Sequence, residues 1–235
     1  MRNYFIKDGE NSLDYGIHIP EMPPIVRARE RVEVRTALGR SGSLTVREGT
    51  ETKPVHDSYI KSVEIVIKDK SQIDGISRWL TGRGEFIFSN EPSRKYIGYI
   101  SEQFELSRMF GTWHKGILSI EVEPYKYAVP IANEIKVVAP KGIVENPGTV
   151  YSLPAIVVYG SGKGTITING NDYIVNPVTD GMVIDSDTMQ VYKGNSNLNN
   201  AVNSEDFPWI KTGENIIMLN GGITQIVITP RWRYL

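Results

Sequence analysis

Along most of this chain, apolar and polar residues alternate with a period of two, which is typical of strands that bury one face. The pattern is clearest in residues 63–68, 84–88 and 113–124, and further strands are expected over residues 95–101 and 102–110. Successive side chains of a strand point to opposite faces, so each segment can cover a core on one side and meet solvent on the other. We therefore expect a mainly β fold.

Turn residues divide the second half of the chain into short strands. Asn-Gly at residues 169–170 accepts the positive φ angles of a tight hairpin turn. Similar signals recur at Asp180-Gly181, Gly194-Asn195 and Asn220-Gly221-Gly222. Short strands at this spacing predict a β-sandwich or jelly roll. The glycine-rich segment 160–164 is predicted to be a hairpin loop between two of these strands.

Helical periodicity is rare, and residues 71–80 give the best example. Ser71 is expected to be the N-cap of this short helix, with Asp74 three residues later and Gly82 as the stop signal. The apolar residues with helical spacing are Ile73, Ile76 and Leu80. We expect one short helix packed on the strands of the first part of the chain.

The charge density changes near residue 130. Residues 1–128 hold 19 of the 26 Lys and Arg and 18 of the 27 Asp and Glu, whereas residues 129–235 hold only 7 and 9. The alternating pattern also breaks at residues 127–130. Two composition regimes favour two domains, which we place at residues 1–130 and 131–235.

The side chains that usually bind metals are scarce and scattered. The chain has no cysteine, which removes disulfides, thiolate chemistry and sulfur-bound metals. His18, His56 and His114 are far apart in sequence, unlike the closely spaced ligands of most metal sites. Asp185-Ser186-Asp187 lacks the longer series of ligands that a calcium loop needs. We expect no metal and no cofactor.

Two segments superficially resemble catalytic motifs. Gly39-Arg40-Ser41-Gly42-Ser43 lacks the final glycine of a serine-hydrolase elbow. Gly160-Ser161-Gly162-Lys163-Gly164-Thr165 has the wrong spacing for a phosphate loop, and a strand is expected to follow it instead of a helix. Nothing singles out a pair of catalytic carboxylates among the 27 acidic residues. The sequence does not indicate an enzyme.

The overall charge bears on the class of partner. A net charge of −1 gives no cationic surplus with which to displace the counterions of a nucleic acid, so specific nucleic-acid binding is not expected. No stretch approaches the roughly 18–20 apolar residues of a membrane span, so no membrane partner is expected either.

An arginine cluster is the most informative charged feature. It is interrupted by Glu30, Glu33 and Glu48, and its members are Arg27, Arg29, Arg31, Arg35, Arg40 and Arg47. Spacing in steps of two places the first four on one face of an extended segment. Two interpretations have similar weight: a solvated edge strand whose charges block unwanted pairing, or a segment that docks on a neighbouring subunit through Arg–carboxylate pairs. Nucleic-acid binding ranks third because glutamates separate the arginines.

Several stretches, in the same order along nearly the whole chain, resemble the distal tail protein of siphovirus-type bacteriophages, often called Dit, or a prophage copy of it. In the first half these include Asn11-Ser12-Leu13-Asp14-Tyr15-Gly16-Ile17 and residues 29–34, 39–44 and 124–127. In the second half they are sharper, and include Asn146-Pro147-Gly148-Thr149, Phe207-Pro208-Trp209-Ile210 and residues 152–156, 160–162, 213–217 and 230–235.

The resemblance implies an N-terminal domain similar to a split β-barrel with one short helix, and a C-terminal galectin-like β-sandwich. It also implies a homo-hexamer, in which the first domains close a ring around the tail channel. A hairpin or extended loop at residues 35–53 would embrace the next subunit.

The implied ring joins the tail tube protein to a tail-tip protein of the tail-associated lysin or tail-fibre type, and the second domains can carry a receptor-binding protein. The implied location is the distal tail of the virion, after assembly in the cytoplasm of the bacterial host. DNA would pass through the channel without specific binding, and most of the arginine cluster would face other subunits.

A carbohydrate- or receptor-binding β-sandwich module of a phage tail is the alternative. It would need exposed aromatic side chains flanked by polar groups on one face. Binding in the galectin manner is disfavoured, since the second domain has no histidine and its only tryptophans are Trp209 and Trp232. A cell-wall hydrolase is a third hypothesis, for which no acidic or metal cleft is evident.

Overall fold

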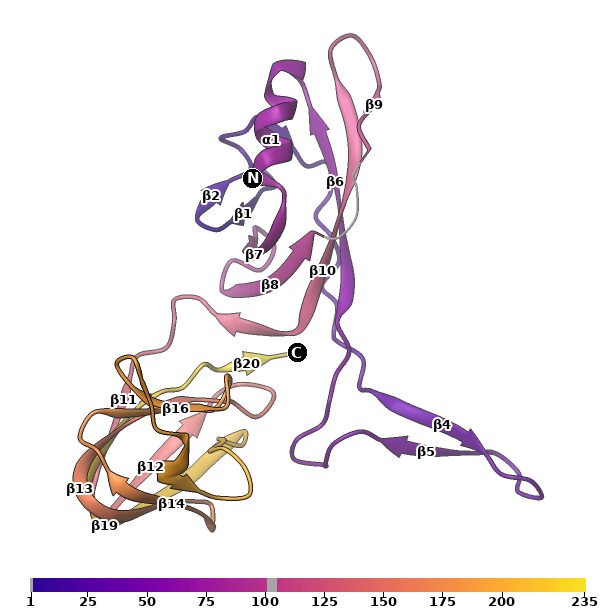
Figure 1. Ribbon diagram of the computed structural model, residues 1–235. Coiled ribbons are helices and arrows are strands. Elements are labelled where there is room, and N and C mark those ends of the chain that lie inside the picture. The colour runs from indigo at the N-terminus through magenta and orange to yellow at the C-terminus, as the bar shows by residue number, and fades with distance from the viewer. Residues whose placement is uncertain (1, 101–104) are drawn as a thin grey trace. The chain divides into compact units, whose positions relative to one another are not determined.

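The computed structural model describes residues 2–100 and 105–235. The chain forms two compact units, one of residues 1–129 with Leu235 and one of residues 130–234. Strands account for most of the regular structure in both units, and the described residues include one α-helix and two 3-10 segments (Figure 1). The expected mainly β fold is confirmed.

A curled antiparallel sheet forms the body of the first unit. Its strands run in the order β2-β1-β7-β8-β10-β6-β3, and β9 pairs with β10. Their bounds are β1 Phe5–Lys7, β2 Glu10–Asn11, β3 Ile17–His18, β6 Tyr59–Ile67, β7 Gly82–Phe88, β8 Arg94–Ile100, β9 Ser107–Arg108 and β10 His114–Ala128.

Residues 101–104 lie outside the described residues, and two strands inferred from the sequence extend into them. The strand expected over residues 95–101 is described as β8, which ends at Ile100. Of the strand expected over residues 102–110, the structure shows the two residues of β9.

The predicted helix is present, but its predicted N-cap is wrong. A 3-10 turn, η1 Lys70–Gln72, precedes α1 Ile73–Trp79, and Gln72 occupies the N-cap position without a side-chain hydrogen bond. The local cap lies earlier, where the Asp69 carboxylate accepts a hydrogen bond from the Ser71 N–H at 2.9 Å. A 3-10 turn thus takes the place of the capping box.

The core of the first unit lies between α1 and the concave face of the sheet. Ile76 of α1 is fully buried and packs with apolar side chains of β6, β7 and β10. The half-buried Trp79 is stacked on Phe5 with 5.4 Å between ring centroids and on Tyr15 with 4.3 Å. The amphipathic helix therefore covers the sheet as its pattern predicts.

Two long strands organise the second unit. β13 Ala155–Ile168 and β19 Gly213–Thr229 pair along nearly their whole length. The first half of β13 also pairs with β15 and its second half with β14, while β19 pairs with β12 and then with β11. The other bounds are β11 Ile135–Val138, β12 Lys141–Asn146, β14 Asn171–Val178, β15 Met182–Asp185, β16 Gln190–Lys193, β17 Ser196–Asn197, η2 Asn199–Ala201, β18 Val202–Asn203 and β20 Arg233–Tyr234.

The predicted hairpin loop at residues 160–164 is wrong. This segment lies inside β13, where the register with β19 shifts between Tyr159 and Gly164. A side chain at Gly160 would overlap the carbonyl oxygen of Gly222 on the opposite strand, and Gly160 has φ 141°. The glycines thus let two long strands bend together at a bulge, whereas a hairpin would reverse the chain.

The bend gives the second unit two half-sheets that share one core. Ile156 and Ile228 come from one half and Ile168 and Ile217 from the other, and all four belong to the same buried cluster. This is the packing of a β-sandwich. Trp232 is 6% exposed and belongs to the same buried cluster, so this tryptophan is a core residue.

The tight turn predicted at Asn169-Gly170 is confirmed. It joins β13 to β14, and both residues have positive φ, 51° and 90°. Asn and Gly tolerate this conformation better than other residues. The turn predicted at Asn220-Gly221-Gly222 is wrong, because these residues lie inside β19.

Candidate functional site

A hairpin outside both large sheets carries three of the six arginines of the cluster. β4 Val32–Thr36 and β5 Ser43–Arg47 pair with each other in a two-stranded sheet of their own. We call residues 29–57, which contain this hairpin, the arm (Figure 1). Nearly every side chain of β4 and β5 is exposed, so no other described part of the chain packs over this hairpin.

Backbone hydrogen bonds and one buried side chain fix the root of the arm. The backbone N–H of Arg31 donates to the Val55 carbonyl at 2.8 Å, and the Asp57 N–H donates to the Arg29 carbonyl at 2.9 Å. His56 is 7% exposed, and its Nδ1 lies 3.2 Å from the Tyr125 hydroxyl. The histidine therefore has a structural position beneath the arm.

Each face of the hairpin carries both apolar and charged side chains. Because directly paired residues share a face, Glu33 lies beside Val46 and Arg35 beside Leu44 on one face. The other face carries Val34 beside Thr45, with Arg47 next to Val32. The arginine cluster is therefore divided between the two faces.

Three of the six arginines form ion pairs within the arm. Arg31 contacts Asp57 at 2.6 Å and Glu48 at 3.4 Å, and the hydrogen bond that its guanidinium group donates to Asp57 is the main reason that the Arg31 pKa is raised. Arg35 pairs with Glu33 at 2.7 Å, which raises its pKa, and Arg47 with Glu30 at 3.4 Å. The arginine side chains are half exposed or more, so each pair adds little to the stability of the free chain.

The other three arginines have no such pair among the residues that the structure describes. Arg27 and Arg29 precede the hairpin, and Arg40 lies in the β4–β5 connection, all with exposed side chains. Their guanidinium groups can bind carboxylates of a partner.

Exposed apolar side chains accompany the arginines, and they were not among the predicted interface residues. Leu38 is fully exposed, Val34 is 59% exposed and Val46 is 47% exposed. The signal was available, since Val32 and Val34 alternate with the charged residues. Apolar side chains together with arginines are typical of the buried part of a protein–protein interface.

The histidines remain separate in the structure. His18 is exposed, and His114 Nδ1 lies 2.9 Å from the Thr112 carbonyl. Among residues 2–100 and 105–235, no three His, Asp or Glu side chains form a group that could hold a metal ion. The described helix is not long and apolar enough to cross a membrane.

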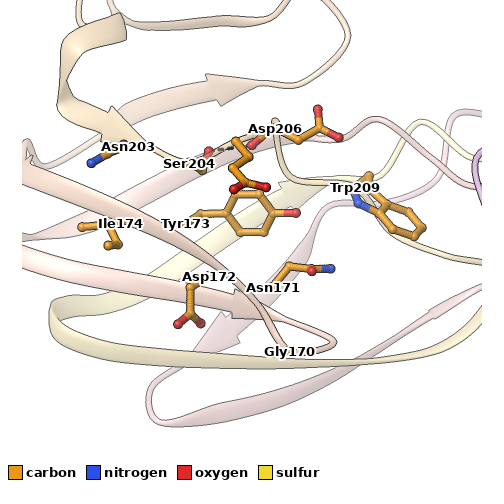
Figure 2. A pocket seen from close by; sticks show the side chains of 10 residues that line it. Gly170, Asn171, Asp172, Tyr173, Ile174, Asn203, Ser204, Asp206 and Trp209 are labelled. Carbon is orange, nitrogen blue, oxygen red and sulfur yellow. Dashed lines mark hydrogen bonds between the residues drawn. The ribbon is translucent and has the colours of Figure 1, made fainter.

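The second unit has an open pocket beside β14. Its volume is about 600 Å³, and it is lined by Gly170, Asn171, Asp172, Tyr173, Ile174, Asn203, Ser204, Glu205, Asp206 and Trp209. Figure 2 shows the hydroxyl end of Tyr173 directed toward Trp209. Burial, together with the nearby Asp206, raises the pKa of Tyr173 to about 12.

Trp209 supplies a half-buried ring at one side of this pocket. Its ring meets Tyr151 edge-on, with centroids 6.1 Å apart. The rest of the pocket lining includes the amide side chains of Asn171 and Asn203 and the carboxylates of Asp172, Glu205 and Asp206. An aromatic ring with neighbouring amides and acids can stack on a polyhydroxylated ligand and hydrogen-bond its hydroxyl groups.

A solved structure shares the fold of the whole chain. It is the crystal structure of the Dit protein of phage SPP1, a paradigm of the hub adsorption apparatus in phages that infect Gram-positive bacteria. The match covers 100% of both chains with a TM-score of 0.78 and 16% sequence identity. The sequence matches no protein-family model and no curated protein. The resemblance to distal tail proteins is thus confirmed at the level of the fold, including the galectin-like second unit.

Proposed function

We propose that this chain is a structural protein of a siphovirus-type phage tail that forms the hub at the distal end of the tail. Six copies close a ring, which joins the tail tube protein to a tail-tip protein of the lysin or fibre type. The chain is part of the virion and is assembled in the cytoplasm of the bacterial host. The observation that carries the proposal is the full-length likeness to the SPP1 Dit fold.

The arm supports a role in joining subunits. Its two strands satisfy each other's backbone groups but leave apolar and charged side chains exposed on both faces. Burying these side chains on a neighbour would remove apolar surface from water and give the unpaired arginines carboxylate partners. In the ring, each arm lies on the next subunit, and Arg27, Arg29, Arg31, Arg35, Arg40 and Arg47 face subunits instead of the channel.

The outer face of the first sheet offers a second contact surface. Ile60 is 60% exposed on β6, Ile117 is 58% exposed on β10 and Tyr99 is 51% exposed on β8. Glu121 pairs directly with both Ile60 and Tyr99 across the strands, so apolar side chains stand in adjacent strands. A neighbouring copy of the first unit covers this face in the proposed ring.

The charge balance suits a channel for DNA. A net charge of −1 provides no global attraction for the phosphate backbone, so DNA can pass without being held. The chain acts by assembly and attachment, and not as an enzyme. Its second unit is the place where a receptor-binding protein docks.

Cross-linking of the arm to the sheet of the next subunit tests the ring directly, because the absence of cysteine leaves room for designed thiols. Ser43→Cys on β5 is combined with a cysteine at one of several exposed positions on the sheet, such as Ser62→Cys. A homobifunctional maleimide should give a ladder of covalent species that ends at six copies. A ladder that continues beyond six, or stops at two, would contradict the hexameric ring.

Glycan binding by the second unit is the alternative function, and the pocket at Trp209 favours it. If it is correct, Trp209→Ala should abolish binding of host cell-wall glycans while leaving the ring intact. The matched control is Trp232→Phe, because Trp232 is buried in the core away from the pocket lining. Glycan arrays that show no binding by the intact chain would remove this alternative.

A further inference from the structure

The polypeptide that leads to the arm is held in an unusual way. We call residues 20–28 the strap, since they connect β3 to the arm. Pro20, Pro23 and Pro24 have no N–H and cannot complete a sheet edge. Among the described residues, no backbone–backbone hydrogen bond is formed by residues 20–28.

Side chains of the first unit hold the strap instead, by donating to its carbonyl groups. Asn90 Nδ2 donates to the Pro23 carbonyl at 3.0 Å, Lys61 Nζ to the Pro24 carbonyl at 2.9 Å and the Tyr59 hydroxyl to the Val26 carbonyl at 3.4 Å. Asn3 Nδ2 adds a bond to the Pro20 carbonyl at 3.2 Å. Apolar packing adds to these bonds, since Met22 packs against the core of the first unit and Pro23 and Ala28 are buried.

Lys61 is the exceptional member of this set, because it places an ammonium group in the core. The residue is 2% exposed, and Nζ lies 4.9 Å from the ring centroids of both Phe88 and Tyr96. The Pro24 carbonyl is the one hydrogen-bond acceptor that the described residues provide for it. Cation–π contacts and one carbonyl replace only part of the hydration that the ammonium would have in water.

The charged groups around Lys61 do not neutralise it. Glu91 lies beside Lys126 of β10, with 3.2 Å between Oε1 and Nζ, and its other oxygen accepts a hydrogen bond from the Tyr96 hydroxyl. The Glu91 carboxylate thus interacts electrostatically with two buried ammonium groups, those of Lys61 and Lys126. Tyr59 of β6 and Tyr96 of β8 complete the titratable groups that face this site, and burial raises the pKa of both phenols, that of Tyr59 to about 12.

We propose that the strap is a proton-coupled latch: it closes over neutral Lys61 and opens when this side chain takes up a proton and returns to water. Burial lowers the pKa of Lys61 from 10.5 to about 8, although Glu91 opposes this change. A group with a lower pKa in the closed form releases a proton on closing, so closing is favoured as pH rises.

The pH window follows from these two values. Above about pH 10.5 the lysine is neutral in both forms, whereas below about pH 8 it is charged in both. Linkage sets the upper limit of the change in the open-to-closed ratio at about 300-fold across this window. We expect the open-to-closed ratio to change at least about tenfold between pH 10 and pH 7.

The consequence for assembly rests on the proposed function. In the proposed ring, opening of the latch near neutral pH releases the root of the arm. The arm can then reach the next subunit. The latch itself is a property of the single chain and can be measured without a ring.

Two spin labels would report the latch in the full chain. They are attached at Ile25→Cys in the strap and Arg78→Cys on α1, where both native side chains are exposed. Pulsed distance measurements at a concentration at which the protein is monomeric should show one short distance at pH 10. A second population at longer distance should grow at least about tenfold in relative amount by pH 7.

Two variants separate the latch from a general loss of structure. Lys61→Met keeps the volume and removes the charge, so the population ratio should no longer depend on pH. Asn90→Ala weakens the strap without a titrating group, so opening should increase at every pH with the same slope as in the wild type. An unchanged ratio in the wild type between pH 7 and pH 10, or a slope that survives in Lys61→Met, would overturn the latch while leaving the ring untouched.

Discussion

At the scale of single residues, the stability of the second unit depends on polar side chains that the core encloses completely. Asn215 is fully buried, and its amide donates to the carbonyls of Lys211 and Gly213 at 2.9 and 2.7 Å. Its Oδ1 accepts from the Lys211 N–H at 2.9 Å and from Asn169 Nδ2 at 2.7 Å. One side chain thus ties the β13–β14 turn to the start of β19.

Replacing this residue should therefore be costly. We expect Asn215→Ala to lower the free energy of unfolding of the second unit by about 2–4 kcal/mol, since several buried backbone groups lose their partner. Urea unfolding monitored by tryptophan fluorescence gives the value. The exposed Asn195→Ala is the control, with an expected change within about 0.5 kcal/mol. A loss below about 1 kcal/mol for Asn215→Ala would contradict the network.

The ion pair of Asp185 and Arg231 predicts how the second unit responds to acid. Both carboxylate oxygens accept hydrogen bonds from the guanidinium group, at 2.7 and 2.8 Å. Burial by itself would raise the pKa of Asp185, but the hydrogen bonds from Arg231 and from backbone N–H groups lower it below 3.8. A lowered pKa in the folded state adds stability above the unfolded value, and this stability is lost as pH falls through the folded value.

We therefore expect the melting temperature of the wild type to fall steeply below about pH 4. In Asp185→Asn the melting temperature should be lower at pH 7, and its decline below pH 4 should be shallower. Calorimetry at pH 7, 4 and 2.5 measures both effects. Equal slopes for the two proteins would show that Asp185 does not contribute to the acid sensitivity.

At the scale of elements, the bend of β13 and β19 is the feature on which the sandwich depends. We expect Gly160→Ala to destabilise the second unit by about 2 kcal/mol or more, because a Cβ there meets the Gly222 backbone. Gly162→Ala is the matched control, since Gly162 also has positive φ, 78°, but open space around it. The melting temperature of Gly160→Ala should be well below that of Gly162→Ala. The reverse order would contradict the close approach of Gly160 to the Gly222 backbone.

Local chemistry decides which elements could be predicted from the sequence. Although the same dipeptide lies inside β19 at Asn220-Gly221, the Asn169-Gly170 turn was predictable because both residues tolerate positive φ. The bulge at residues 160–164 was not, because the same glycines suit a loop or a bent strand, and the choice depends on pairing with residues more than fifty positions later. For the same reason, the arginine cluster was visible in the sequence, but its division between two faces depends on the register of β4 and β5.

At the scale of the whole molecule, the arm should matter for assembly and not for folding. Its strands form no ladder with either large sheet, and its ion pairs are exposed. We expect that replacing residues 33–46 by a short Gly-Ser turn leaves the melting temperature within about 2 °C of the wild-type value, since little buried surface is lost. A large drop in melting temperature would show that the arm is part of the fold.

Charge in the arm should act on assembly in the same way. Arg40→Glu reverses the charge of a side chain in the β4–β5 connection that has no ion pair among the described residues. This change should raise the protein concentration needed for assembly by about tenfold or more. Arg78→Glu on α1 is the control with an equal change in net charge, and it should assemble as the wild type does. Sedimentation velocity over a concentration series compares the two, and equal behaviour would remove Arg40 from the interface.

The most direct test of the ring is the mass of the intact chain in solution, measured by multi-angle light scattering over a concentration series. We expect a species of about six times 26.4 kDa, with six-fold rings and a central hole in negative-stain images, either alone or after mixing with the tail tube protein. The variant without residues 33–46 should remain monomeric under the same conditions. A wild-type chain that stays monomeric at every concentration, also in the presence of the tail tube protein, would contradict the hub function.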